Sequence, residues 1–198
     1  GRALRVSGRL RRALRGRGVV VAFHRVNDRS AGDPITKSPA DYRHFCSFFK
    51  ANFDVVPLTD FMALLESGRS VEGKLVITHD DGYLDNRTEA APILADLKLP
   101  ATFFVTTDFI ESETVPHWDA DLGVAHPWMS WDQVRELRRM GFEIGSHTRT
   151  HANLGATSPD DTAHELAESR ARLERELGET PALFAYPYGG LANMNEVN

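Results

Sequence analysis

Strand-like and helix-like segments alternate along most of this chain, and that alternation is the strongest constraint on its fold. Short runs of β-branched and aromatic residues are separated by longer segments with helical periodicity. The predicted strands are 19–23, 74–78, 101–105, 142–145 and 182–185, and the predicted helices are 38–52, 61–67, 89–97, 131–140 and 159–177. Such alternation favours βα units that build one parallel sheet.

Local capping signals mark several helix ends. Ser130 and Gln133 have the spacing of a capping box at the start of one predicted helix. Thr59 or Asp60 is expected to cap another helix at its N-terminus. Gly178 is expected to end the last long helix, because glycine readily adopts the left-handed conformation found there.

The composition is that of an ordinary globular domain. The chain has 198 residues, of which 41% are hydrophobic and 26% are charged. No apolar run approaches the roughly 20 residues needed to cross a bilayer. The single cysteine, Cys46, excludes an internal disulfide and fits a reducing compartment. The early apolar run 19–23 is too short for a signal peptide, so we expect a cytoplasmic location.

Positive charge is concentrated at the start of the chain. Residues 1–18 contain seven arginines and no acidic residue, which leaves 16 basic and 28 acidic residues, a net charge of −12, for residues 19–198. We expect a basic arm followed by one folded domain. The thin apolar stripe of the arm consists of Ala3, Ser7, Leu10 and Leu14. The arm is either a surface helix packed through this stripe or a contact for an anionic membrane or polymer. The acidic body argues against nucleic acid as a partner.

Two adjacent carboxylates follow one predicted strand, in the motif Thr78-His79-Asp80-Asp81-Gly82. Neighbouring side chains on a regular strand point to opposite faces, but a turn at Gly82 lets both carboxylates reach one cavity. One carboxylate can then bind a cation while the other accepts a proton. The alternative is a plain turn with a helix cap. We expect His79 to face away from Asp80 and to pack inside the fold.

Two histidines, His147 and His151, follow the predicted strand 142–145. They can converge on one ion if their backbone forms roughly a helical turn. One carboxylate and two imidazoles leave an open coordination position, which is typical of catalytic rather than structural zinc sites. This ligand set suits zinc, cobalt, nickel or iron. The alternative is a pair of hydrogen-bonded loop histidines.

Other side chains with site-forming chemistry are less constrained by their pattern. His24 follows the first strand and either lines the site, where it binds substrate or delivers a proton, or is a hydrogen-bonded strand-end histidine. Trp118 and Trp128 offer flat faces for sugar rings, whereas Trp131 is expected to pack on its helix. The histidines expected at the surface are His44, His117, His126 and His164.

These motifs resemble those of the polysaccharide deacetylase family, the NodB-homology or carbohydrate esterase family 4 domain. The family motif Thr-Phe-Asp-Asp-Gly corresponds to 78–82, and its second motif, which begins with His-Ser/Thr and ends in a second His, corresponds to 147–151. The third motif ends in Pro-Tyr-Gly, here 187–189. The order and spacing match, and the resemblance covers about residues 19–198. The sequence Phe-His-Arg-Val at 23–26 also resembles the Tyr-His-x-Val of a branch that acts on bacterial surface polysaccharides.

The resemblance implies a distorted (β/α)7-type barrel with its active site at the carboxyl ends of the strands. Asp81, His147 and His151 would bind one divalent metal, usually zinc. Asp80 would be the general base.

The resemblance also implies roles at the rim of the site. The backbone N–H of Tyr188 would help to hold the oxyanion, and Tyr186 and Pro187 would shape the substrate-binding rim. Two residues depart from the family pattern: His79 replaces the usual Phe, and Ala185 stands where an Arg often orients the base. The late Leu-x-His motif, which supplies the proposed general acid, has no counterpart, so we expect a barrel truncated at its C-terminal end.

The expected function is that of a metal-dependent hydrolase that removes N-acetyl groups from an amino-sugar polysaccharide or glycan precursor and releases acetate. One alternative is an O-acetyl esterase or another C–N hydrolase on the same scaffold. A second alternative is a catalytically inactive carbohydrate-binding protein. The sequence indicates a carbohydrate partner and no obligate protein partner.

Overall fold

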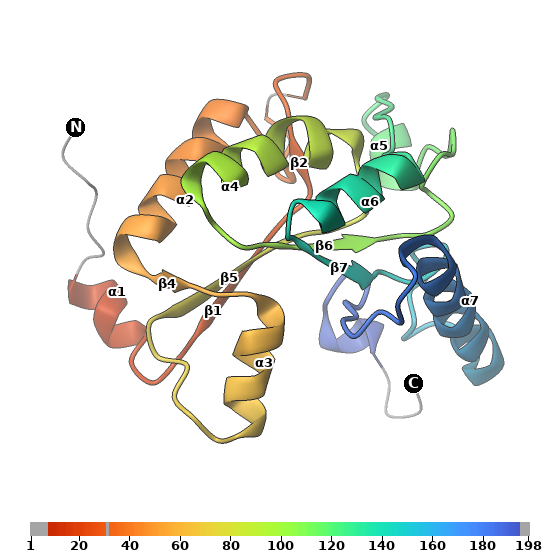
Figure 1. The fold of residues 1–198 in the computed structure, drawn as a ribbon. Coiled ribbons are helices and arrows are strands. Elements are labelled where there is room, and N and C mark those ends of the chain that lie inside the picture. Colours follow the sequence, from red (N-terminus) through yellow and green to blue (C-terminus); the bar gives the residue numbers. More distant parts are fainter. Residues whose placement is uncertain (1–7, 31, 195–198) are drawn as a thin grey trace.

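A parallel sheet lies at the centre of the computed structural model, which describes residues 8–30 and 32–194 (Figure 1). Its strands run in the order β1, β5, β6 and β7, and β4 pairs with the first half of β5. Their bounds are β1 Val19–Phe23, β4 Asp54–Val55, β5 Lys74–His79, β6 Thr102–Val105 and β7 Glu143–Ser146. A second, two-stranded sheet pairs β2 (Arg25–Val26) with β3 (Thr36–Lys37). The predicted α/β architecture is confirmed.

Helices cover both faces of the main sheet (Figure 1). The helices α2, α4 and α6 lie along one face, α3 lies on the other, and α7 lies beside β7. Their bounds are α2 Pro39–Asn52, α3 Leu58–Glu66, α4 Ala91–Leu97, α6 Trp131–Arg139 and α7 Pro159–Leu177. The shorter helices are α1 Gly8–Ala13, α5 His117–Ala120, the π-helix Asn86–Ala90 and the 3₁₀-helix Leu191–Asn193.

Side-chain alternation along β5 divides the interior into two parts. Leu75 and Ile77 join the main core on the side of α2, α4 and α6. Val76 joins a smaller cluster with Phe61 of α3 and with Val71. Successive side chains on a strand point to opposite faces. This alternation therefore determines on which face of the sheet each polar residue at the end of β5 lies.

His79 is fully buried on the α2 side of β5. Its ring stacks on Phe23 and Phe103, with centroid distances of 5.6 and 4.9 Å. Its Nε2 shares a 2.7 Å hydrogen bond with the Tyr42 hydroxyl, whereas its Nδ1 has no partner in the part of the chain that the structure describes. Burial, followed by the charge of His24, lowers the pKa of His79 to about 3. The expected packing of His79 inside the fold is confirmed.

Stability should fall as the pH drops below about 6.5, in part because of His79. The unfolded chain protonates this side chain near pH 6.5, whereas the folded protein does so only near pH 3. The unfolded state therefore binds one more proton between these values, and the free energy of unfolding decreases by up to about 1.4 kcal/mol per pH unit on acidification. Replacing His79 by Phe should remove this contribution, as measured by urea unfolding between about pH 6.5 and about pH 5.

The control for this prediction addresses the hydrogen bond that His79→Phe also removes. Tyr42→Phe deletes the same hydrogen bond and keeps the His79 imidazole that titrates. Comparing Tyr42→Phe with the double variant Tyr42→Phe/His79→Phe therefore isolates the proton linkage. Identical pH slopes in these two variants would contradict the prediction.

Most helix ends follow local signals, but the start of α3 does not. The predicted capping box of Ser130 and Gln133 is present, and Gly178 ends α7 with a φ of 75°. The prediction that Thr59 or Asp60 caps the third helix is wrong, because that helix begins at Leu58 without a side-chain cap of its own.

A tertiary contact replaces the local cap of α3. The Glu143 carboxylate of β7 accepts hydrogen bonds from the backbone N–H groups of Leu58 and Thr59, at 2.8 and 3.1 Å. It thereby satisfies donors that a helix N-terminus otherwise leaves unpaired.

Two predicted elements differ in form. The predicted helix 89–97 is the short α-helix α4 preceded by a π-helical turn. The predicted strand 182–185 is reduced to one parallel bridge between Ser146 and Phe184. On the opposite side of the sheet, β1 pairs only with β5 among the described residues. The sheet therefore remains open in the part of the chain that the structure describes.

Part of the predicted basic arm lies outside the described residues. These are residues 1–7, which include Ala3 and Ser7, and nothing is described of the Leu10 side chain. Within the described part, Leu14 is half-buried, and the Gly16 N–H donates a hydrogen bond to Glu72. The membrane contact of the arm stays a prediction. Among the described helices, none combines the length and the apolar character that a membrane crossing requires.

Candidate metal centre and active-site cleft

The carboxyl ends of the parallel strands surround a cleft of about 390 Å³. Its walls come from the segments that follow β1, β5 and β7 and from the segment that follows the Phe184 bridge. The residues that line it are Ala22, His24, Ile35, Asp80, Asp81, His117, Trp118, His147, His151, Tyr186, Tyr188 and Gly189. Sequence segments up to 167 positions apart therefore meet at the edge of the sheet where parallel α/β proteins place their sites.

A tight turn directs Asp81 into this cleft. The Gly82 N–H donates a 3.0 Å hydrogen bond to the Asp80 carbonyl, and Asp81 between them has a φ of 77°. Such a φ is strained for a residue with a side chain, and strain of this kind clusters at functional sites. Gly82 permits the turn, since a Cβ at that position would lie 2.8 Å from Ile110 Cδ1.

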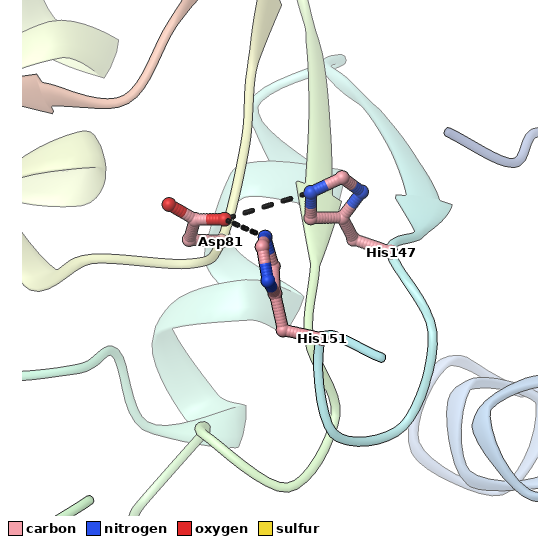
Figure 2. Close-up of side chains that lie close together, drawn as sticks. All are labelled: Asp81, His147 and His151. Carbon is pink, nitrogen blue, oxygen red and sulfur yellow. Dashed lines mark ion pairs between the residues drawn. The ribbon is translucent and has the colours of Figure 1, made fainter. Parts of the chain in front are cut away.

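Asp81, His147 and His151 bring three potential metal-ligand atoms together (Figure 2). The Asp81 Oδ1 atom lies 3.6 Å from His147 Nε2 and 3.3 Å from His151 Nε2. All the potential ligand atoms of the cluster lie within 4.8 Å of one another. Asp81 Oδ1 and His151 Nδ1 are buried without a hydrogen-bond partner among the described residues. One carboxylate oxygen and two imidazole nitrogens that converge in this way fit a divalent metal.

The second nitrogen of His147 fixes the orientation of its ring. Its Nδ1–H donates a 2.9 Å hydrogen bond to the Ala185 carbonyl, which leaves the lone pair of Nε2 facing Asp81. Burial is the main cause that lowers the pKa of His147 to about 4. The imidazole is therefore neutral at pH 7, which is the form that binds metals.

The two histidines converge although the backbone between them does not form a helical turn. Thr148 and His151 both have left-handed backbone angles, with φ values of 64° and 63°. The Thr148 hydroxyl accepts a hydrogen bond from the Ala152 N–H at 3.2 Å. The two rings meet with centroids 4.9 Å apart because the loop folds back on itself, and not because they lie one helical turn apart.

Asp80 lies beside this cluster without joining it. Its side chain is 15% exposed, and its Oδ1 has no hydrogen-bond partner among the described residues. Its Oδ2 lies 4.0 Å from Nε2 of His24, a side chain that is 31% exposed. Burial, followed by repulsion from Asp81, raises the pKa of Asp80 to about 8. A neighbouring cation would act in the opposite direction and favour the carboxylate.

For Asp81, burial alone would raise the pKa, but the contact with His151 and the charge of His147 outweigh burial and lower it. The two adjacent carboxyl groups thus have opposite shifts. This difference matches a pair in which one group stays ionised while the other exchanges a proton.

The segment after the Phe184 bridge forms another wall of the cleft. Tyr188 has a φ of 66°, is half-exposed, and places its ring edge-on to His151 at 4.9 Å. Its backbone N–H donates no hydrogen bond to any of the described residues. Tyr186 lines the cleft, but Pro187 is buried and does not. Pro187 joins the two tyrosines, and its role in the substrate-binding rim stays a prediction.

Trp118 and His117 form an aromatic side of the cleft. Trp118 lies 4.7 Å from His151, measured between ring centroids, and presents part of its indole to the cleft. His117 is exposed as expected, but it also lines the cleft.

The prediction that His126 lies at the surface is wrong. It is 8% exposed, its Nε2 shares a 3.0 Å hydrogen bond with Ser30, and its ring lies edge-on to Tyr83 with centroids 6.0 Å apart.

A buried polar network holds Trp118 in place. The sequence alone did not predict this network. The Trp118 Nε1–H donates to the Tyr83 hydroxyl at 2.9 Å, and that hydroxyl donates to Asp119 at 3.0 Å. Arg25 is fully buried and pairs with both Asp119 and Asp33. The available signal was an arginine between His24 and Val26, directly after the apolar strand 19–23, where an unpaired buried charge would be costly.

The fold and the cluster together define an α/β protein with a candidate divalent-metal centre at the carboxyl ends of its strands. The chain matches the polysaccharide deacetylase family model over residues 67–196, and it belongs to that family. The resemblance found in the sequence motifs is thereby confirmed.

Relatives and solved structures agree with this membership. A putative polysaccharide deacetylase, YxkH, of Bacillus subtilis (strain 168) is 26% identical over 135 residues, which cover 68% of this chain and 44% of that protein. The poly-beta-1,6-N-acetyl-D-glucosamine N-deacetylase of Escherichia coli (strain K12) is 23% identical over 204 residues, which cover 86% of this chain and 30% of that protein. The structure of IcaB from Ammonifex degensii superposes with a TM-score of 0.74 at 22% identity, covering 89% of this chain and 77% of that one.

These comparisons differ in what they establish. At 22% identity the structural likeness to IcaB shows the fold alone. The chain spans less than half the length of both curated relatives.

Proposed function

We propose that this chain is a metal-dependent deacetylase that removes acetyl groups from an N-acetylated amino-sugar polysaccharide or glycan precursor. The observation that carries the proposal is the convergence of Asp81, His147 and His151 in a cleft that also contains the unpaired carboxyl group of Asp80. Membership of the polysaccharide deacetylase family supports the reaction class.

The metal would be held by Asp81 Oδ1 and by the Nε2 atoms of His147 and His151. Zinc is the first candidate for this set of ligands, and cobalt, nickel or iron would also fit. When bound, such an ion supplies Lewis acidity and lowers the pKa of a coordinated water from about 15.7 to about 7.

The surrounding residues have separate tasks in amide hydrolysis. Asp80 takes the proton of the attacking water, whose oxygen bonds to the acetyl carbon. The backbone N–H of Tyr188 donates to the oxyanion of the tetrahedral intermediate. The C–N bond then breaks, acetate leaves, and the amine takes a proton. His24, which lines the cleft next to Asp80, is the candidate to deliver that proton.

The aromatic walls support a sugar as the substrate. Trp118 and Tyr188 flank His151 and expose ring surface to the cleft. Aromatic faces of this kind offer a large and rigid contact area with a polar edge. The similarity to the E. coli poly-beta-1,6-N-acetyl-D-glucosamine N-deacetylase supports an N-acetylated hexosamine unit.

The direct test is acetate release from N-acetylglucosamine oligomers by the purified protein. We expect release that stops after chelation and returns when zinc is added back. A parallel panel of O-acetylated sugars separates the proposed function from an esterase, because an esterase would prefer those substrates. Tight glycan binding without acetate release in the zinc-loaded protein would contradict the proposal and establish a binding protein instead.

A further inference from the structure

Glu165, a buried residue of α7, hydrogen bonds to the loop that joins the two histidines of the candidate metal centre. It is 8% exposed, although it carries a carboxylate. Its Oε2 accepts hydrogen bonds from the backbone N–H groups of Arg149 and Thr150, at 3.0 and 2.8 Å. Its Oε1 accepts a third hydrogen bond from the Thr150 hydroxyl, at 2.8 Å. One side chain thus contacts two consecutive residues between His147 and His151.

The opposite side of this loop is held by the segment that follows β6. The Thr107 N–H donates to the Thr148 carbonyl at 3.3 Å, and the Asp108 N–H donates to the Arg149 carbonyl at 2.9 Å. The carbonyl groups of the loop are therefore bound from one side, and its N–H groups are bound from the other. The contacts from the segment after β6 are made by backbone groups, which a substitution leaves in place. The contacts from Glu165 are made by its side chain, so a substitution can remove them.

The loop requires such support because its conformation is unfavourable by itself. Thr148 and His151 adopt left-handed backbone angles, which are unfavourable for residues that carry a side chain. Hydrogen bonds to an ionised carboxylate are stronger than those between neutral groups. Glu165 can therefore offset part of this cost and hold the loop in its observed shape.

Glu165 makes no hydrogen bond to either histidine side chain, so it acts on them through Arg149 and Thr150 of the loop between them. We infer that Glu165 is a positioning residue that sets the separation of His147 and His151 and thereby tunes the affinity of the site for its metal. The inference rests on the metal dependence in the proposed function. Supporting residues around metal ligands typically change metal affinity by about 10- to 100-fold.

The test is a zinc titration of Glu165 variants against a chromophoric chelator, followed by the visible spectrum of the cobalt-loaded protein. Glu165→Ala is expected to weaken zinc binding by about 10- to 100-fold and to alter the cobalt bands. Glu165→Gln should restore most of the affinity, because its amide oxygen can accept from both N–H groups while its NH₂ donates to Thr150 Oγ1. The matched control is Glu168→Ala, an exposed glutamate of the same helix, which should bind zinc like the unchanged protein.

The outcomes separate this inference from the proposed function. Wild-type affinity in Glu165→Ala overturns the inference and leaves the deacetylase proposal standing. Weaker binding in Glu165→Ala, together with absent acetate release from the zinc-loaded wild type, supports the inference and contradicts the activity. Failure of the unchanged protein to bind zinc overturns both. If Glu165→Ala does not fold, Glu165→Asp takes its place: its shorter side chain cannot reach both N–H groups, and unchanged affinity in that variant would overturn the inference.

Discussion

Replacing Asp80 by Asn is expected to lower kcat for acetate release by about 10²- to 10⁴-fold while the protein keeps its metal. The amide has nearly the same shape as the carboxyl group, but it cannot accept the proton of the attacking water. Asp80 stands beside the ligand cluster and is not part of it, so metal binding should persist. Initial rates on N-acetylglucosamine oligomers and elemental analysis of the same preparation measure both quantities. Full turnover by Asp80→Asn would show that another group is the base.

His147→Ala provides the contrast. It removes one of the three ligand atoms and should therefore lose both the metal and the activity. His44→Ala, which changes an exposed histidine on α2, is the matched control and should lose neither. An Asp80→Asn protein that also lost its metal would place Asp80 among the ligands and would reject the division of tasks between the two aspartates.

Replacing Arg25 by Met is expected to destabilise the protein by about 3–5 kcal/mol, the largest stability change that we predict. Arg25 and Asp119 are both fully buried, and Arg25 also pairs with Asp33. Methionine fills much of the same space but leaves the carboxylates without their cation, and uncompensated charge in the interior is costly. Urea unfolding monitored by circular dichroism measures the change in the free energy of unfolding.

An exposed pair supplies the control for this prediction. Arg43 and Asp96 form a surface salt bridge with side chains 49% and 63% exposed, so Arg43→Met should change stability by no more than about 1 kcal/mol. Removing both charges in Arg25→Met/Asp119→Leu should recover part of the loss, because the fully buried Asp119 carboxylate is then absent and only Asp33 lacks its cation. If Arg25→Met cost no more than Arg43→Met, the buried network would not be a source of stability.

Signals confined to a few neighbouring residues predicted much of the fold. The helix predicted at 159–177 has those bounds in the structure, since its early proline lies within the segment and its serine cap and terminal glycine directly flank it. The capping box at Ser130 is correct for the same reason. The start of α3 was not predictable in this way, because its backbone donors are satisfied by Glu143, a residue of β7 about 85 positions away.

The candidate site, like the fold, was predicted from the sequence only in part. The carboxylate pair and the histidine pair each follow a strand within a short motif, so the sequence could identify them as a cluster at the carboxyl ends of the strands. The sequence indicated that a helical turn would let the two histidines converge, whereas the loop between them has left-handed residues and contacts Glu165 of α7 and the segment after β6. The role of Arg25 was missed because both of its partners come from other segments.

The sequence by itself determined the alternating architecture, the family and the residues that make up the candidate site, because hydrophobic periodicity, capping and short motifs are properties of contiguous residues. Only the tertiary structure decided how those residues face one another. It placed Asp81 opposite the two histidines, kept Asp80 apart from them, and anchored Trp118 on a buried ionic network. The reason is physical: side-chain distances, burial and the pKa shifts that follow from burial arise between segments that fold against each other, and no single segment contains them.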